Sequence, residues 1–289
     1  MLISGLIGVK EIVMADRAGF CFGVKRAVDA IVNTLESSAE GAEIWSIGMP
    51  IHNPQEVARL RAMGLQVAED ESAIPEGATV LIRAHGEPRA VMEKLRSKGG
   101  AIVDMTCPHV RRAQERAGAL SSQGYDVVLL GDALHPEIRS IMGYVDGPVD
   151  VVADAAEAGN LPKRSRVALI SQTTQQEELL ADIAFVLVPK TGELCVCNTI
   201  CKATVERQEA VRRLAGRVDG VVLVGGKESA NTAKLRDIAR ANGMDVLWIE
   251  SADGMDGGWL EGKTKIGIAA GASTPQWLIT DVCNKIARM

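Results

Sequence analysis

Short apolar runs rich in β-branched residues alternate with amphipathic helical patterns along almost all of this 289-residue chain. Nearly every run leads into a helical pattern, an order that is typical of parallel sheets whose strands are joined by helices. The alternation therefore predicts the α/β fold class. The expected strands are Ile12–Ala15, Ile44–Ile47, Thr79–Arg83, Ile102–Met105, Asp126–Leu130, Val167–Ile170, Gly220–Val224, Val246–Ile249 and Ile266–Ala269.

Composition indicates a globular chain with a small partner. The chain is 47% hydrophobic and 24% charged, and its length suffices for two or three compact units. A net charge of −5 disfavours a general nucleic-acid binder, although a local basic pocket for a small anion remains compatible with it.

The N-terminal apolar stretch, residues 2 to 9, is brief, lacks a basic leader and is followed by Lys10 and Glu11. It resembles neither a signal peptide nor a membrane span, so we expect a cytoplasmic protein that does not enter a membrane. In a reducing compartment, where disulfides are rare, the six cysteines are expected to be small buried side chains, metal ligands or reactive groups.

Three cysteines, Cys21, Cys107 and Cys201, each stand at the turn that opens an expected helix, with 86 and 94 residues between successive members. A helix N-terminus favours a thiolate and can donate hydrogen bonds to sulfur. A single cysteine in this setting is most often a small buried residue, but three matched settings favour one shared inorganic centre with an open coordination position. Iron and sulfur are favoured over zinc, because zinc sites usually need closely spaced ligand pairs.

The other cysteines, Cys195, Cys197 and Cys283, are interpreted as small buried side chains. The run from Cys195 to Cys201 is only a weak match to a zinc motif. In a strand, Cys195 and Cys197 would face the same side, toward the interior.

Three of the four histidines occupy loop motifs at strand-to-helix turns: His52 before Asn53, His85 before Gly86 and His135 before Pro136. Each alone could equally be a cap or a partly buried residue. Their shared placement, where open α/β sheets bind ligands, favours donation to phosphate oxygens. The fourth, His109, is assigned no role.

Two further turns can bind an anion. Residues 225 to 232 follow an apolar strand and open a helix, bringing Ser229 and Asn231 to its N-terminus, and Ser273 occupies a similar turn downstream. Both serines could instead be simple helix caps. Neither turn is a phosphate-binding loop of the Walker type, and no dinucleotide fingerprint appears.

Two residues near these turns can move or orient a proton. Glu137 follows His135 by two positions, and Thr173 follows the expected strand that ends at Ile170. A carboxylate in a dry, phosphate-lined pocket can have its pKa raised enough to act as an acid near neutrality.

These motifs together resemble those of the 4-hydroxy-3-methylbut-2-enyl diphosphate reductase family, from about Ile12 to the C-terminus. As an ordered set they are highly specific. They are Gly19-Phe20-Cys21, His52-Asn53, Ala84-His85-Gly86, Asp104-Met105-Thr106-Cys107-Pro108, His135-Pro136-Glu137, Ser171-Gln172-Thr173-Thr174, Thr199-Ile200-Cys201-Lys202-Ala203-Thr204, Ser229-Ala230-Asn231 and Gly271-Ala272-Ser273-Thr274-Pro275.

The resemblance implies three similar α/β units with small parallel sheets, arranged as a trefoil around one central [4Fe-4S] cluster. The units would be residues 22–106, 107–200 and 201–289, the last completed by the N-terminal strand within residues 1–21. Cys21, Cys107 and Cys201 would bind the cluster, leaving one iron without a protein ligand.

The resemblance also implies the remaining roles. Substrate-binding positions match His52, His85, His135, Ser229, Asn231 and Ser273. Glu137 would supply protons and Thr173 would orient the substrate hydroxyl. The family reduces its substrate with two electrons and two protons to isopentenyl and dimethylallyl diphosphate, releasing water. It belongs to the non-mevalonate pathway and takes electrons from an external ferredoxin or flavodoxin.

The chain departs from the family pattern in places: Ala230 stands where many members have a second serine, Leu134 replaces a common glycine, and residues 1 to about 10 extend beyond the usual start. Two other functions fit the sequence less well. A metal-binding module without catalysis would not explain Glu137 and the anion-binding turns. A nucleotide-sugar or phosphosugar transferase would leave the three thiols without a role.

Overall fold

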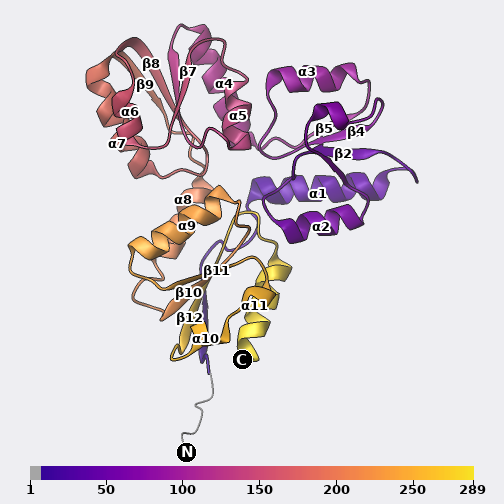
Figure 1. The fold of residues 1–289 in the computed structure, drawn as a ribbon, viewed down its shortest axis with the longest axis vertical. Helices are drawn as coiled ribbons and strands as arrows, with labels where there is room; N and C mark the ends of the chain where they lie inside the picture. The colour runs from indigo at the N-terminus through magenta and orange to yellow at the C-terminus, as the bar shows by residue number, and fades with distance from the viewer. Residues whose placement is uncertain (1–7) are drawn as a thin grey trace, which may run out of the picture. The chain divides into compact units, whose positions relative to one another are not determined.

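The computed structural model describes residues 8–289, and the chain divides into two compact units (Figure 1). The C-terminal unit consists of Met1–Val24, His52–Arg59 and Lys202–Met289, of which residues 1–7 lie outside the described part. The central unit consists of Lys25–Ile51 and Leu60–Cys201. Most of the N-terminal extension and its apolar stretch therefore fall outside the described residues.

The C-terminal unit contains one four-stranded sheet in the order β1-β12-β10-β11, and every pair in it is parallel. Its strands are β1 (Glu11–Met14), β10 (Gly220–Val224), β11 (Val246–Ile249) and β12 (Lys265–Ala270).

The central unit contains two four-stranded parallel sheets, ordered β3-β2-β4-β5 and β7-β6-β8-β9. Their strands are β2 (Ile44–Ile47), β3 (Gln66–Ala68), β4 (Thr79–Ile82), β5 (Ile102–Asp104), β6 (Asp126–Leu130), β7 (Val149–Val152), β8 (Arg164–Ser171) and β9 (Thr191–Cys197).

All three sheets follow one connection rule. The first strand in sequence (β2, β6 or β10) lies between the second and the third. The second strand forms one edge of the sheet, and the fourth strand, next to the third, forms the other edge. In the C-terminal unit, β1 takes the place of the fourth strand. A glycine after each first strand donates its N–H to the last residue of the second strand: Gly48 to Ala68 at 2.7 Å, Gly131 to Val152 at 3.0 Å and Gly225 to Ile249 at 2.9 Å.

Helices follow most of the strands, as the alternation predicted. The helices are α1 (Phe22–Ser37), α2 (Pro54–Ala62), α3 (Arg89–Ser97), α4 (Pro108–Ser122), α5 (Pro136–Met142), α6 (Ala155–Asn160), α7 (Glu177–Leu187), α8 (Lys202–Arg212), α9 (Ala230–Ala241), α10 (Gly257–Leu260) and α11 (Gln276–Ala287). Short 3-10 turns occur at Glu71–Ala73, Val188–Lys190 and Ala252–Gly254.

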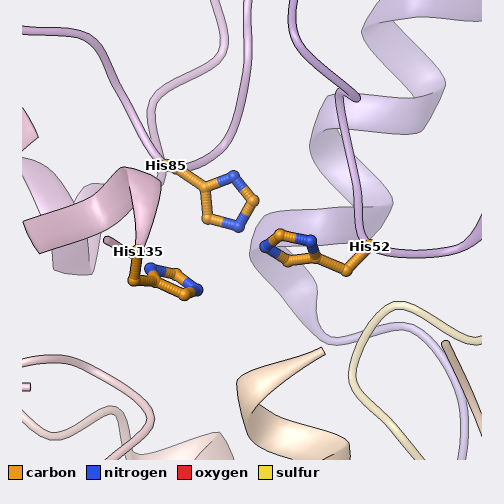
Figure 2. A group of neighbouring side chains, drawn as sticks. All are labelled: His52, His85 and His135. Carbon is orange, nitrogen blue, oxygen red and sulfur yellow. The ribbon is translucent and has the colours of Figure 1, made fainter. Parts of the chain in front are cut away.

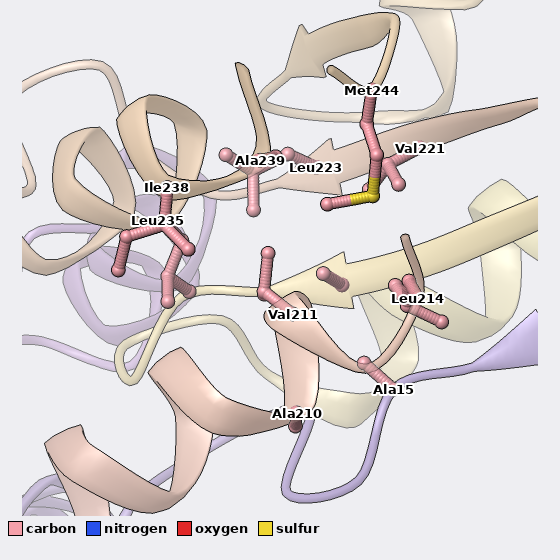
Figure 3. Packing of buried hydrophobic residues seen from close by; sticks show 11 residues of the cluster. Ala15, Ala210, Val211, Leu214, Val221, Leu223, Leu235, Ile238, Ala239 and Met244 are labelled. Carbon is pink, nitrogen blue, oxygen red and sulfur yellow. The ribbon is translucent and has the colours of Figure 1, made fainter. Parts of the chain in front are cut away.

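Successive residues of the central strands pack against helices on opposite faces of each sheet, because side chains alternate along a strand. In β10, Leu223 belongs to the cluster that includes Val211 of α8 and Leu235 of α9 (Figure 3), whereas Val224 belongs to the cluster that includes Ile279 of α11. Burial on both faces explains why these strands read as continuous apolar runs.

The sheet β7-β6-β8-β9 is covered in the same way. Leu129 packs in the cluster formed with α4 and α5, and Leu130 packs in the cluster formed with α6 and α7. Figure 1 shows the two helix pairs on opposite faces of this sheet. The carboxyl ends of the strands, and the turns that follow them, are thereby left for the functional residues.

The predicted α/β class with small parallel sheets is confirmed. Every expected strand overlaps a strand of the structure, while β3, β7 and β9 were not expected. The division at residues 22–106, 107–200 and 201–289 stays a prediction, since contacts group the chain into two units. Among the described residues, no helix is long and apolar enough to cross a bilayer.

Candidate functional site

Each of the three cysteines directly precedes a helix, as predicted: Cys21 precedes α1, Cys107 precedes α4 and Cys201 precedes α8. Cys107 is the N-cap of α4, and Pro108 fills the first helical position, where no amide proton is needed. At the start of α1, the N–H of Val24 points at the Sγ of Cys21, 3.4 Å away. Helix N-termini therefore surround these sulfur atoms with positive potential.

The cysteines occupy equivalent places in the three sheets. Each follows the fourth strand of its sheet, and each donates its backbone N–H to the residue two positions beyond the end of the third strand. These hydrogen bonds run from Cys21 to Ala272 at 3.0 Å, from Cys107 to Ala84 at 2.9 Å and from Cys201 to Thr173 at 2.9 Å. The turn that carries each thiol is thus fixed to the neighbouring turn of the same sheet.

Two arginines fix the segments in front of two of these cysteines. Arg207 of α8 is only 4% exposed and donates to the carbonyl of Gly19 at 2.8 Å. Arg26 of α1 donates to the carbonyls of Met105 and Thr106 at 3.0 and 2.5 Å. Sequence reasoning missed both residues, because only the fold shows which distant carbonyls they reach.

Glu137 and Thr173 form a buried pair in the central unit. The carboxylate of Glu137 accepts the N–H of Thr173 at 2.6 Å and its hydroxyl at 2.9 Å, and the two residues are 2% and 6% exposed. Burial raises the pKa of Glu137 to about 7, against the opposing effect of these two hydrogen bonds. This carboxyl group can therefore hold or release a proton near neutral pH.

His135 is the N-cap of α5 and is 7% exposed. Its Nδ1 accepts the N–H of Glu137 at 3.1 Å, so a neutral ring carries its proton on Nε2. The ring of His85, in the turn after β4, lies edge-on to that of His135, with centroids 5.4 Å apart and planes at 89° (Figure 2, which also draws His52). The central unit thus places two imidazoles beside the Glu137 turn.

The close packing around His85 requires a glycine at the next position. Gly86 has a φ of +71°, and a Cβ there would lie 2.6 Å from Nε2 of Gln114 and 2.9 Å from Oγ of Ser140. Gln114 and Ser140 are themselves hydrogen-bonded at 2.6 Å. A larger residue would push the His85 turn away from α4 and α5.

The C-terminal unit holds the other predicted binding residues. Ser229 is the N-cap of α9, where its Oγ accepts the N–H of Thr232 at 3.3 Å, and Asn231 lies in the first turn of that helix. Both are buried, at 3% and 5% exposed. Ser273 follows β12 and donates its hydroxyl to the carbonyl of His52 at 2.9 Å. Polar side chains in this unit therefore collect at the N-terminus of α9 and at the turn after β12.

Equivalent positions in the three sheets carry the candidate binding residues. Four residues beyond each glycine that follows a first strand stand His52, His135 and Ser229. In the turns after the third strands, the corresponding positions are His85, Thr174 and Ser273. Thr174 was noted in the sequence only beside Thr173, without a binding role, and its equivalence to His85 and Ser273 is the signal that would have assigned it one.

The predicted site residues are thus distributed over both units. The central unit holds Cys107, Cys201, His85, His135, Glu137 and Thr173, and the C-terminal unit holds Cys21, His52, Ser229, Asn231 and Ser273. His109, which was assigned no role, is exposed on α4, and Leu134 is 72% exposed.

Comparison with known proteins assigns the family. The chain is 43% identical over 276 residues to a 4-hydroxy-3-methylbut-2-enyl diphosphate reductase of Geobacter sulfurreducens, covering 96% of each chain. A counterpart from Aquifex aeolicus is 40% identical over 279 residues, again covering 96% of each chain.

Solved structures agree. One is an (E)-4-hydroxy-3-methyl-but-2-enyl diphosphate reductase described as the terminal enzyme of the non-mevalonate pathway, 40% identical, with a TM-score of 0.72 over 96% of this chain and 99% of that one. The fold also matches a Plasmodium falciparum reductase that is 24% identical, with a TM-score of 0.89 over 95% of this chain and 87% of that one. The family model described as LytB protein matches residues 12–287, and the chain therefore belongs to the LytB protein family.

Proposed function

We propose that this chain is a 4-hydroxy-3-methylbut-2-enyl diphosphate reductase. It would add two electrons and two protons to its substrate, expel the hydroxyl group as water, and form isopentenyl and dimethylallyl diphosphate. The names of the relatives that match over 96% of the chain support this assignment. The observation that carries it is the equivalent placement of the three cysteines, each fixed by its N–H to the turn after a third strand.

The cysteines suit an iron-sulfur cluster. Three thiolates at helix N-termini offer soft ligands in a positive potential, and the N–H of Val24 already points at the sulfur of Cys21. In the proposal, Cys21, Cys107 and Cys201 bind one [4Fe-4S] cluster and leave one iron without a protein ligand. When bound, such a cluster supplies single electrons and a Lewis acid.

The diphosphate would be held by hydrogen-bond donors at the turns. His135 presents Nε2–H when its ring is neutral, because Nδ1 accepts the N–H of Glu137. Ser229 and Asn231 stand at the N-terminus of α9, where the helix dipole favours negative charge. His52, His85 and Ser273 complete the proposed set of ligands for the phosphate oxygens.

Glu137 is the proposed proton donor. Its pKa of about 7 leaves a large fraction protonated at neutral pH, whereas an exposed glutamate would be fully ionised. Thr173 fixes the carboxyl group through its N–H and hydroxyl and would orient the substrate hydroxyl. The departing hydroxyl needs a proton to leave as water, and Glu137 can deliver it from a buried position.

Electrons must come from outside the chain. The sequence contains no dinucleotide fingerprint, so we propose an external ferredoxin or flavodoxin as the donor, in the cytoplasm. Anaerobic turnover of the purified diphosphate with an artificial reductant tests the reaction without that partner. Formation of both isomeric products would support the proposal, and protein that carries iron and sulfide but forms neither would contradict it.

A further inference from the structure

Cys195 and Cys197 form a pair of thiols that the proposed reaction does not use. Both lie on β9, which is the edge strand of its sheet, and their Sγ atoms are 4.0 Å apart. Because they are two positions apart on one strand, they face the same side, where both pack partly buried against the cluster that contains Ala113 and Ile170. The prediction that both face inward is confirmed.

Pairing with β8 fixes the backbone beneath the two thiols. Cys195 is in register with Ala168, and Cys197 is in register with Ile170. A rise of about 3.3 Å per residue puts the two Cα atoms roughly 6.6 Å apart, near the upper limit for a disulfide. A direct S–S bond of about 2.05 Å would thus require the sulfur atoms to move far closer together while the paired strand resists.

A single bridging ion fits the observed separation without moving the strand. Zinc–thiolate bonds are about 2.3 Å long, and two such bonds at the tetrahedral angle span roughly 3.8 Å, within a few tenths of an ångström of the separation of the two sulfur atoms. The sulfur atoms of Cys195 and Cys197 are 4.0 Å apart as they stand. The two side chains are therefore positioned to bind one ion together.

The surroundings of Cys197 favour its protonated form as long as no ion is bound. Burial, with a contribution from Cys195, raises the pKa of Cys197, and the positive charges of Arg116 and Arg112 on α4 lower it less. The same arginines favour the Cys197 thiolate once its proton leaves. Arg112 and Arg116 are exposed, and both cysteines are themselves partly exposed, so an ion can reach the pair from solvent.

We propose that Cys195 and Cys197 form a two-thiolate binding site for a soft divalent cation of the zinc and cadmium type. Each thiol releases its proton to solvent, two metal–sulfur bonds form, and no group is oxidised or reduced. Water fills the remaining coordination positions. The site is independent of the proposed cluster and of the proposed reaction.

Cadmium titration of the intact protein, with its native iron and sulfide bound, tests the site. The readout is the thiolate-to-cadmium charge-transfer band in the ultraviolet difference spectrum. Wild-type protein should bind one tight equivalent, and Cys195→Ala or Cys197→Ala should weaken binding at least about tenfold, because half of the ligand set is lost. Cys283→Ala is the matched control, since that thiol is also partly buried but lies on α11, and it should bind as wild type.

Peptide mapping on wild-type protein covers the case in which a variant fails to fold. Cadmium should protect Cys195 and Cys197 from alkylation, measured by fragment-ion mass spectrometry that assigns the modification to each cysteine, because the tryptic peptide of residues 191–202 also contains Cys201. Unchanged alkylation of Cys195 and Cys197, or tight cadmium binding by a folded double variant that carries both Cys195→Ala and Cys197→Ala, would overturn the proposal. Protection confined to Cys21, Cys107 and Cys201 would overturn it as well. That result would also show that these three thiols were not occupied by a cluster, so a failure of the cluster assignment is distinguished from a failure of the cadmium site.

Discussion

The carboxylate of Glu137 accepts two hydrogen bonds from one residue, Thr173, through its N–H at 2.6 Å and its hydroxyl at 2.9 Å. Both bonds favour the ionised carboxylate, yet burial outweighs them and the pKa stands at about 7. The carboxyl group of Glu137 is therefore present in both its protonated and its ionised form at neutral pH, as a proton donor requires.

Turnover should depend on pH through this carboxyl group. Only protonated Glu137 can deliver a proton, so kcat should be high below pH 7 and fall about tenfold per pH unit above it. Glu137→Gln should retain bound iron but lose turnover at every pH. Glu157→Gln, at an exposed carboxylate on α6, is the control and should follow the wild-type profile. An unimpaired rate for Glu137→Gln would refute the proton role.

Stability should respond to pH in the opposite sense from a salt-bridged carboxylate. The pKa of Glu137 is about 7 in the folded protein and near 4.5 in the unfolded chain, so the folded state retains a proton that the unfolded state has lost. The contribution of this group is fully present below pH 4.5 and declines as pH rises to 7, by at most about 3 kcal/mol. Glu137→Gln, whose amide oxygen can accept the N–H of Thr173 and whose NH2 group can donate to the Thr173 hydroxyl, should remove this decline. Melting curves from pH 5 to 8 measure it, and parallel curves for the two proteins would contradict it.

Removing one of the three proposed sulfur ligands tests the cluster assignment. Cys107→Ser should bind less iron and abolish turnover, because a serine hydroxyl is a hard ligand that remains protonated at neutral pH. Cys283→Ser removes a thiol outside the set and should leave both quantities unchanged. Iron and sulfide analysis with an anaerobic rate measurement checks this, and normal iron with a normal rate in Cys107→Ser would remove Cys107 from the ligand set.

The strands that could be predicted from the sequence are those whose residues form compact apolar runs. In β10, every residue is buried, so GVVLV reads as a strand without its context. The three strands that were not expected, β3, β7 and β9, all lie at sheet edges. β3 has three residues and β9 interleaves exposed positions such as Glu193, so neither gives a clear apolar run. Their pairing depends on a neighbouring strand far along the chain.

The matched turns at the three cysteines could be predicted from the sequence, but the position-by-position equivalence of the three sheets could not. Cys107 and His135 stand out because each precedes a proline that begins a helix. The equivalence of the three cysteine turns lies in backbone hydrogen bonds, to which any residue type contributes the same atoms. Such bonds do not depend on side-chain identity, so the three cysteine turns can be equivalent in structure without being similar in sequence.

Arg207 should stabilise the Cys21 turn from a distance along the chain. Its guanidinium donates to the carbonyls of Gly19 and Ala203, and Arg207→Met would leave the carbonyl of Gly19 without this donor at a cost of about 1–3 kcal/mol. Arg207→Lys should recover part of the loss. Arg212→Met, which removes a partly exposed ion pair with Glu209 on the same helix, should cost below about 1 kcal/mol. Urea unfolding and iron content measure both effects, and equal losses in the two methionine variants would argue against a specific role of Arg207.

Gly226 should be required for the placement of His52. A Cβ at this position would lie 2.6 Å from the carbonyl oxygen of His52, the same atom that accepts the hydroxyl of Ser273. Gly226→Ala must therefore displace the His52 turn, which should destabilise the protein by about 1–3 kcal/mol and raise the KM for the diphosphate more than it lowers kcat. Gly159→Ala on α6 is the matched control: its Cβ would meet nothing nearer than Val186 at 3.7 Å, so it should be neutral or slightly stabilising and leave KM unchanged. Steady-state kinetics and melting temperatures measure both effects. A wild-type KM in Gly226→Ala would show that the His52 turn does not contact the diphosphate.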